Sequence, residues 1–177
     1  SGHILGSSLT HLNIGNGLHN LVYTADMKYA KTNVLEAAHT QFNRVETLII
    51  ESTYGGRANV MAEKEADAYM TKVILDTFER GGKVLMPVLG SGRAQEVMII
   101  VEKLMREKKI PQAPVYIDGM LWDITAIHTA YPEFLNRDIK DQIFRKENNP
   151  FLSPIFKKVG SHKERTELIL EEGPCLI

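Results

Sequence analysis

The chain has 177 residues, of which 44% are apolar and 24% are charged, and its formal net charge is −1. This composition is typical of a globular domain with its own core and excludes a disordered or uniformly basic polypeptide. The single cysteine, Cys175, excludes an internal disulfide. Because no stretch approaches the roughly 20 apolar residues of a membrane-spanning helix, we expect a cytoplasmic protein.

Both ends of the sequence are typical of a piece of a longer polypeptide. Residues 1–8 form a small and polar cluster without a lead-in, and residues 174–177 (PCLI) end the chain on an apolar run. Such a run is typical of the first residues of a buried strand. We therefore expect the natural polypeptide to continue.

The first quarter of the chain predicts a hairpin followed by a loop. Residues 9–22 hold two apolar runs separated by the turn sequence GNG at residues 15–17. A polar loop then extends to about residue 44. The continuous apolar run TLII at residues 47–50 predicts a strand that is covered on both faces.

Helices and strands alternate after this point. Strands at residues 84–89 and 114–117 are interleaved with helices at residues 62–79, 92–108 and 121–131. This order predicts parallel strands joined by crossover helices, with the first strand bent or ended by its proline. The apolar face expected for the first helix comprises Ala66, Tyr69, Met70, Val73, Thr77 and Phe78. The face expected for the second comprises Ala94, Val97, Met98, Val101, Leu104 and Met105.

The region at residues 136–161 is less regular, although its apolar residues must be buried. A last helix is expected to begin at Ser161, with Glu164 at the capping-box position. The apolar residues expected in the core are Ile139, Ile143, Phe144, Phe151 and Phe156.

Three polar side chains stand after apolar strands or at a tight turn, where open α/β sheets place their functional sites. His3 lies between glycines in residues 2–7, Asp26 ends the return strand of the hairpin, and Glu51 follows the run at residues 47–50. Each has an ordinary explanation, since loop histidines, turn-capping aspartates and surface glutamates are common. Only their order along the chain points to a shared function.

A glycine-rich turn at residues 90–92 separates a strand from a helix. Such a turn presents free backbone N–H groups to an anion, and the guanidinium of Arg93 suits a phosphate. The spacing of a Walker loop is absent, and a small-residue turn also serves plain packing. Phosphate binding by Ser91 and Arg93 is therefore one of two explanations.

These elements, in this order, resemble the β-CASP branch of the metallo-β-lactamase family, with the nearest likeness to the archaeal relatives of the cleavage and polyadenylation specificity factor nuclease subunit. GHILGS at residues 2–7 matches the family's G-H-x-x-G-[SA] element, and YTAD at residues 23–26 matches Y-[TS]-G-D, with Ala25 in place of glycine. ESTYG at residues 51–55 matches acidic motif A, and SGRAQE at residues 91–96 matches the segment that opens a β-CASP helix. The likeness covers the whole chain.

The resemblance implies an α/β fold in two parts. Residues 1–50 would be the C-terminal edge of a metallo-β-lactamase domain, built as a β-hairpin. Residues 51–177 would be a β-CASP domain, truncated at its C-terminal end, with a mainly parallel, helix-flanked sheet. The intact parent would be a zinc-dependent ribonuclease of mRNA 3′-end processing or RNA decay, cutting internally or from the 5′ end. Its expected partners are RNA, the remainder of the polypeptide and a second copy in a homodimer.

The same resemblance implies roles for individual residues. His3 would ligate one zinc ion, and Asp26 would bridge two. Glu51 would orient a histidine, from further along the polypeptide, that protonates the leaving group. That Ser91 and Arg93 hold a phosphate of the RNA is our own suggestion.

Several family elements are missing from this chain. The H-x-H-x-D-H box is absent, and the histidine-bearing motifs B and C would lie beyond Ile177. A catalytic zinc site needs about three protein ligands, so the isolated chain is expected to hold no stoichiometric zinc and to cut no RNA. A non-catalytic scaffold or RNA-binding subunit is the alternative, and a metal-free nucleotide-binding domain is the third interpretation. The remaining histidines are expected to be structural or exposed: His11, His19, His39, His128 and His162.

Overall fold

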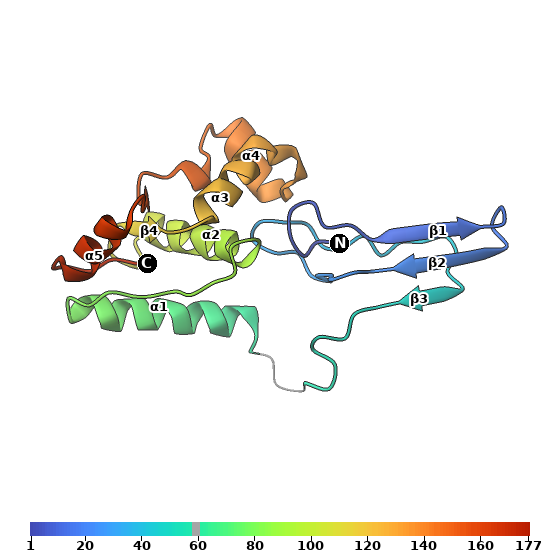
Figure 1. Ribbon diagram of the computed structural model, residues 1–177, viewed down its shortest axis with the longest axis horizontal. Helices are drawn as coiled ribbons and strands as arrows, with labels where there is room; N and C mark the ends of the chain where they lie inside the picture. The colour runs from blue at the N-terminus through green and yellow to red at the C-terminus, as the bar shows by residue number, and fades with distance from the viewer. Residues whose placement is uncertain (58–60) are drawn as a thin grey trace.

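The computed structural model describes residues 1–57 and 61–177. Figure 1 shows two regions: three strands that extend from one end of the molecule, and a body of helices with short strands at the other. The N-terminus lies between them, and the C-terminus lies in the body. Within the described residues, no helix is both long enough and apolar enough to cross a membrane.

The extended region is a three-stranded sheet. Strand β1 (Thr10–Ile14) pairs antiparallel with β2 (His19–Tyr23), which pairs in parallel with β3 (Thr47–Ile49). The predicted hairpin is confirmed, and its turn is closed by a 3.2 Å hydrogen bond from Leu18 N to Gly15 O. All three residues of the GNG turn have positive φ, which explains the glycine–asparagine composition.

The expectation that residues 47–50 are covered on both faces was wrong. Leu48 is 54% exposed, and Ile49 and Ile50 are similarly exposed. β3 pairs with β2 along one edge only. A continuous apolar run thus identified the strand correctly but did not reveal how much of it is covered within the described chain.

The body contains a parallel sheet of short segments. Strand β4 (Val115–Ile117) pairs in parallel with β5 (Phe156–Lys158). Leu176 forms parallel bridges with Val115 on one side and with Val84 on the other. The last residues of the chain therefore lie between the segment at Val84 and strand β4.

This insertion is carried by backbone hydrogen bonds on both sides of the terminal segment. Met86 N donates to Ile177 O at 2.8 Å, and Tyr116 N donates to Leu176 O at 2.8 Å. On the first side, alternate residues donate, Val84 N to Cys175 O and Met86 N to Ile177 O, so the ladder extends to the last residue of the chain. The predicted parallel order is confirmed, but the strand predicted at residues 84–89 is reduced to an isolated bridge at Val84. The sequence order alone did not reveal that residues 174–177 separate the two strands.

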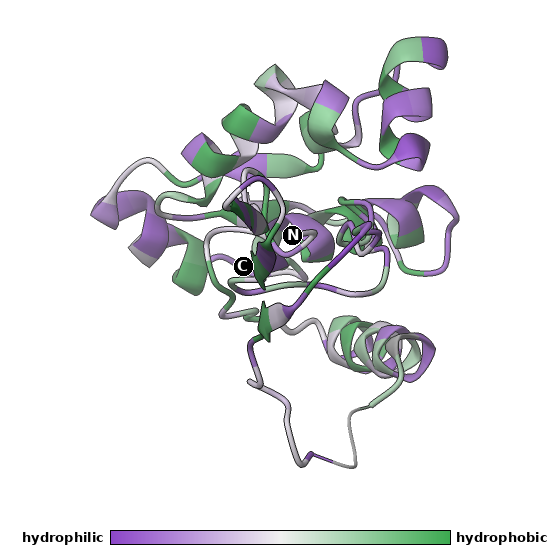
Figure 2. Ribbon diagram, turned by 90° about the vertical axis from the view of Figure 1, so that its right-hand side faces the viewer, coloured by the Kyte–Doolittle hydropathy of each residue, from purple (hydrophilic) through white to green (hydrophobic). Residues whose placement is uncertain are grey.

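In the described part of the chain, five α-helices lie around this sheet: α1 (Glu63–Glu79), α2 (Arg93–Arg106), α3 (Leu121–Ala130), α4 (Arg137–Arg145) and α5 (His162–Leu170). Their positions agree with the helices predicted from periodicity, and α4 occupies part of the region that lacked a clear pattern. In both Figure 1 and Figure 2, α1 lies along one side of the body.

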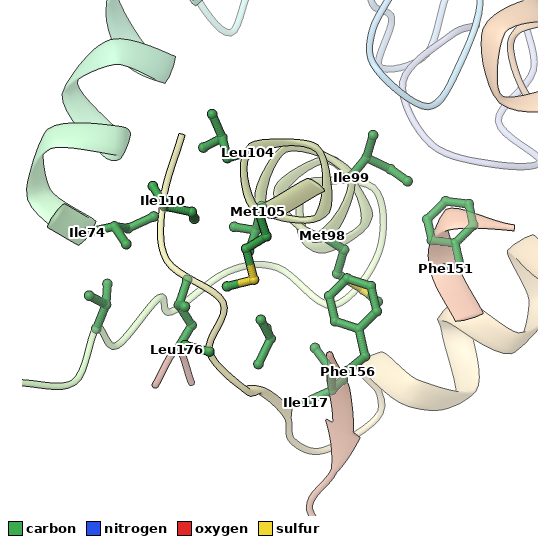
Figure 3. Packing of buried hydrophobic residues seen from close by; sticks show 14 of the residues in the cluster. Ile74, Met98, Ile99, Leu104, Met105, Ile110, Ile117, Phe151, Phe156 and Leu176 are labelled. Carbon is green, nitrogen blue, oxygen red and sulfur yellow. The ribbon is translucent and has the colours of Figure 1, made fainter. Parts of the chain in front are cut away.

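Helix α2 is the centre of the body's hydrophobic core, as Figure 3 shows. Its predicted apolar face is confirmed, because Ala94, Met98 and Val101 are buried together with the residues that continue that face. Burying one such side chain stabilises the fold by roughly 1.5–3 kcal/mol before entropy is counted. Other elements contribute to the same cluster through Ile74, Ile110, Ile117, Phe151, Phe156 and Leu176.

Several predicted packing positions were wrong. In α1 the buried residues are Ile74 and Phe78, whereas Ala66, Tyr69 and Val73 are exposed. Helix α1 therefore faces the core with Ile74 and Phe78, which lie four residues apart. The side of the helix that was predicted to be apolar faces mainly outward. Phe144, which was expected in the core, is 61% exposed on α4, whereas Ile139 of the same helix is buried.

Local caps agree with the sequence. Ser161 Oγ accepts a hydrogen bond from Glu164 N at the start of α5, as predicted. The Glu164 carboxylate accepts from Gly160 N at 2.7 Å, one residue before the usual capping-box partner. Two short 3-10 turns, at Pro132–Phe134 and Pro150–Leu152, join the elements around α4.

Candidate metal centre and the glycine-rich turn

His3 and Asp26 lie side by side at the junction of the two regions. Nε2 of His3 is 3.9 Å from Oδ2 of Asp26. Their side chains are 47% and 74% exposed, so solvent or another segment can reach both. Asp26 follows the end of β2, and His3 lies in the loop before β1.

The loop that carries His3 is closed by two serines. Ser7 Oγ accepts from Ile4 N and donates to Ile4 O, at 3.2 and 2.7 Å. Ser1 Oγ is 2.7 Å from Ser7 Oγ and also donates to the carbonyl oxygen of Asp26 at 2.7 Å. These bonds join the backbone of Asp26 to the loop that carries His3.

Gly2 allows this loop to sit against another segment of the chain. Its φ is +71°, and a Cβ there would lie 2.8–2.9 Å from Ala38 N, Glu36 O and Lys28 O. Because these atoms belong to the backbone, no side chain can be accommodated without moving the segment at residues 28–38. The glycine before His3 is therefore required by packing as well as by φ.

Glu51 is held near the same place through β2. Thr24 N donates to Ile49 O at 3.0 Å, and Glu51 N donates to Thr24 Oγ1 at 3.3 Å. The Glu51 carboxylate in turn accepts from Thr53 N at 2.8 Å. This is how the buried threonine of the YTAD segment fixes the start of the ESTYG segment.

Hydrogen bonds lower the pKa of the Glu51 carboxyl. Those from Thr53 have the largest effect; the Met27 N–H and the nearby His3 add to it, against a smaller opposing effect of desolvation. These contacts place the Glu51 carboxylate beside the segment that carries Asp26. The structure thus brings His3, Asp26 and Glu51 to one location.

The three groups do not form a complete metal site. Among the residues that the structure describes, no cluster of three or more His, Cys, Asp or Glu side chains is arranged to hold a metal ion. Ala25, the departure from the family's Y-[TS]-G-D element, has φ +48°. Glycine adopts this conformation at lower cost, which gives a physical reason for glycine at that position.

The glycine-rich turn at residues 90–92 packs directly on the His3 loop. A Cβ on Gly92, whose φ is +80°, would lie 2.6 Å from Ile4 Cγ2 and 3.4 Å from His3 O. The expectation of free backbone N–H groups holds only in part. Within the described residues the N–H groups of Gly90 and Ser91 have no hydrogen-bond partner, whereas the next three N–H groups are bonded within the turn. Their hydrogen bonds are Gly92 N to Gln95 Oε1, Arg93 N to Ser91 O, and Ala94 N to Leu89 O.

The side chains of this turn remain available. Arg93 is exposed, and within the described part of the chain its guanidinium has no hydrogen-bonding or ionic partner. Ser91 is half-buried beside it. An anion at this turn could therefore be held by these two side chains together with the N–H groups of residues 90 and 91.

Comparison with known proteins supports the assignment of this architecture. The Beta-Casp domain family matches residues 94–177, which span α2 to the end of the chain. The whole chain is 52% identical to transcription termination factor FttA of Methanocaldococcus jannaschii. It is 51% identical to the FttA proteins of Methanothermobacter thermautotrophicus and Pyrococcus abyssi. Residues 94–177 belong to the β-CASP family.

This β-CASP chain matches only part of each relative. Its full length corresponds to 28% of the first two relatives and 27% of the third. The predicted α/β architecture with a helix-flanked parallel sheet is confirmed for the Beta-Casp region. The assignment of residues 1–50 to the edge of a metallo-β-lactamase domain stays a prediction.

The residues after Arg93 have structural roles that sequence reasoning missed. Gln95 is fully buried and donates to Gly90 O and to Thr125 Oγ1, at 3.2 and 3.1 Å. It therefore closes the glycine-rich turn and ties it to α3. A glutamine three residues after the helix cap was the available signal. Glu96 binds a distant segment, for which the sequence carried no signal.

The other histidines of this β-CASP chain agree with their expected structural or surface roles. His11 and His39 both contact the ring of Phe42 in edge-on geometry. His19 Nε2 is 2.9 Å from Thr47 Oγ1. His128 is buried on α3, and its Nδ1 is 2.9 Å from Ile124 O. The fifth, at position 162, is exposed in the first turn of α5.

Proposed function

We propose that the longer polypeptide to which this β-CASP chain corresponds is a zinc-dependent ribonuclease. It hydrolyses phosphodiester bonds of RNA at the junction between the strand region and the helical body. The observation that carries the proposal is the convergence of His3 and Asp26, at 3.9 Å, beside Glu51. Imidazole nitrogens and carboxylate oxygens are common zinc ligands, and these come from separate segments of the chain.

The distance between the two candidate ligands fits one shared ion. Zinc binds histidine nitrogen and carboxylate oxygen at about 2.0–2.2 Å, so two ligands of one ion lie no more than about 4.2–4.3 Å apart. Nε2 of His3 and Oδ2 of Asp26 are within that limit. We propose that the remaining ligands, including the H-x-H-x-D-H box, come from polypeptide outside these 177 residues.

The bound zinc ions would lower the pKa of a water molecule and neutralise charge on the phosphate. His3 would hold one ion through Nε2, and Asp26 would bridge two through its carboxylate oxygens. A glutamate is anionic at neutral pH, and the hydrogen bonds that lower the pKa of Glu51 favour this charged form further. Glu51 is therefore suited to orient and stabilise a protonated histidine, and unsuited to donate the proton itself.

Ser91 and Arg93 are proposed to hold an RNA phosphate next to this centre. The turn that carries them packs on the His3 loop through Gly92 and Ile4. A guanidinium is suited to paired hydrogen bonds with phosphate oxygens. Because the N–H groups of Gly92, Arg93 and Ala94 are already used, we propose that this contact depends mainly on the two side chains.

The named relatives suggest when such an enzyme acts. They are transcription termination factors, so we propose that this protein cuts transcripts as transcription terminates. This extends the expected role in mRNA 3′-end formation. The alternative is a non-catalytic RNA-binding or scaffold subunit, which would retain the fold but not the chemistry.

The decisive experiment compares two polypeptides. Elemental analysis of the 177-residue chain, before and after incubation with excess zinc, is expected to find less than one zinc ion per chain. A polypeptide of the relatives' full length is expected to bind zinc and to cleave RNA. A 5′-labelled RNA distinguishes internal cuts from 5′ trimming.

Variants of the longer polypeptide test the residue roles. Asp26→Asn is expected to reduce cleavage by at least about 100-fold, because the neutral amide cannot bridge two cations. Arg93→Ala is expected to weaken RNA binding and its dependence on salt. Asp141→Asn, on an exposed pair with Arg145 in α4, is the control and should change neither. Zinc-free polypeptide that binds RNA without cutting it would instead support the scaffold alternative.

A further inference from the structure

We propose that Glu96, in the first turn of helix α2, is a positioning residue that sets the location of His3 and Asp26. This inference rests on the proposed function, since it concerns the same site. Glu96 does not touch His3 or Asp26. It acts through a loop segment at residues 32–38, which is bound to the helical body and also packs against Gly2.

The Glu96 carboxylate binds two successive backbone N–H groups of this segment. Oε2 accepts from Asn33 N and Oε1 accepts from Val34 N, both at 2.9 Å. These groups are 63 and 62 residues away from Glu96 in sequence. Hydrogen bonds to an ionised acceptor are stronger than those between neutral groups, so the pair forms a firm attachment.

Asn136 holds the same segment from the direction of α4. Its Nδ2 donates to Thr32 O at 2.9 Å, and its backbone N donates to Val34 O at 2.8 Å. Its Oδ1 accepts from Ile139 N and caps α4. The fully buried Asn136 therefore links the start of that helix to the loop, opposite Glu96.

Apolar packing makes the attachment part of the body. Val34 and Leu35 are buried in the same core cluster as α2. Thr32 closes the turn by accepting from Leu35 N at 2.9 Å and donating its own N–H to Leu35 O at 2.9 Å. The segment is thus a rigid turn inserted in the core, not a loose surface loop.

Continuous contacts lead from this turn to the candidate ligands. Glu36 O and Ala38 N lie where a Cβ on Gly2 would be, next to His3. Ala38 N donates to Lys28 O, and Lys28 N donates to Ser1 O. Ser1 Oγ donates to the backbone of Asp26. Displacing the turn therefore moves the backbone on both sides of the His3–Asp26 pair.

Helix α2 also contacts the His3 loop at a second point. Gly92 packs directly on Ile4, and it lies four residues before Glu96. Gly92 is the residue that caps the start of α2, and Glu96 lies in the first turn of the helix. The start of α2 thus supports the site directly through Gly92 and indirectly through Glu96.

A positioning role must be distinguished from a purely structural one, because an acidic residue in the first turn of a helix also stabilises the helix dipole. Glu102 is the matched control. It is also a glutamate of α2, is buried, and is bound by Arg106 at 3.1 Å. Replacing either glutamate is expected to lower stability, but only Glu96 contacts the segment at residues 32–38.

The first experiment follows the NMR signals of the 177-residue chain. Glu96→Ala is expected to accelerate amide exchange at Asn33 and Val34 by at least about tenfold and to shift the signals of His3 and Asp26. Glu96→Gln keeps one acceptor oxygen and should give an intermediate effect, which also covers the case in which the alanine variant does not fold. Glu102→Gln should leave these signals in place. Unchanged exchange and unchanged His3 and Asp26 signals in Glu96→Gln would overturn the inference.

The second experiment measures zinc affinity and RNA cleavage in the longer polypeptide. Glu96→Ala is expected to lower zinc affinity by roughly 10–100-fold, as changes to groups that orient ligands do. With zinc in excess, kcat should fall while KM for RNA stays the same. Equal zinc affinity and kcat in the Glu96 variants and wild type would overturn the inference. If the wild type neither binds zinc nor cuts RNA while the NMR changes occur, the proposed function fails separately.

Discussion

The two regions of this chain use similar residues and bury them very differently. Every position of β1 is exposed, and Leu12 and Ile14 are about half exposed. By contrast, α2 buries eight of its 14 residues, including Gln95 and Glu102. The strand region is a single layer, whereas the body has helices packed on a parallel sheet.

The difference shows that stability and candidate chemistry are located in different places. A single sheet layer gains hydrogen bonds but little apolar burial, so the strand region depends on its contacts with the body. Those contacts are at Gly2, Gly92 and the segment at residues 32–38. The candidate ligands lie at this junction, and the chain spans 28% of its first-named relative. Three predictions test the comparison, in order of expected effect.

Removing a large side chain from the body should have the largest effect. Phe151 is fully buried and packs against His128, with ring centroids 5.7 Å apart. Phe151→Ala is expected to lower the free energy of unfolding by about 3–5 kcal/mol, measured by chemical denaturation. Leu12→Ala in β1 should change it by about 0.5 kcal/mol or less. Equal losses in the two variants would mean that the strand region is buried to the same degree as the body.

A methyl group at the junction should have an intermediate effect. Gly92→Ala imposes a left-handed φ on alanine, at roughly 1–2 kcal/mol, and places Cβ 2.6 Å from Ile4 Cγ2. Gly119→Ala is the matched control, because Gly119 has φ +65° but no atom within 4 Å of the added Cβ. Chemical denaturation should therefore find a larger loss of unfolding free energy for Gly92→Ala than for Gly119→Ala. Adding Ile4→Ala to Gly92→Ala should restore part of this difference. If it restores none, the contact between residue 92 and Ile4 is not its cause.

The smallest effect on stability near neutral pH is expected from replacing His128. Burial lowers the pKa of this imidazole, and its Nε2 has no partner in the described part of the chain. Below about pH 6.5 the unfolded chain therefore binds a proton that the folded chain excludes. The free energy of unfolding should fall as the pH decreases, by at most about 1.4 kcal/mol per pH unit from this group. In His128→Leu this part of the pH dependence of stability should be absent. An identical pH dependence of the wild type and the variant would contradict the prediction.

The sequence predicted local structure better than burial. It located the hairpin turn, the Ser161 cap and the apolar face of α2, because each depends on residues a few positions apart. It failed on Phe144 and on the exposed β3, because burial depends on which other segments cover a residue. The convergence of His3, Asp26 and Glu51 was expected only from the resemblance to a family, and no local pattern required it.

The sequence by itself determined the type and order of the elements and the identity of the family. The tertiary structure decided that the last residues of the chain lie between Val84 and Val115, and that Glu96 binds backbone groups at residues 33 and 34. The physical reason is the range of the interactions. Periodicity and capping act within about one helical turn. By contrast, the two backbone N–H groups that bind Glu96 are 62 and 63 residues away from it in the sequence.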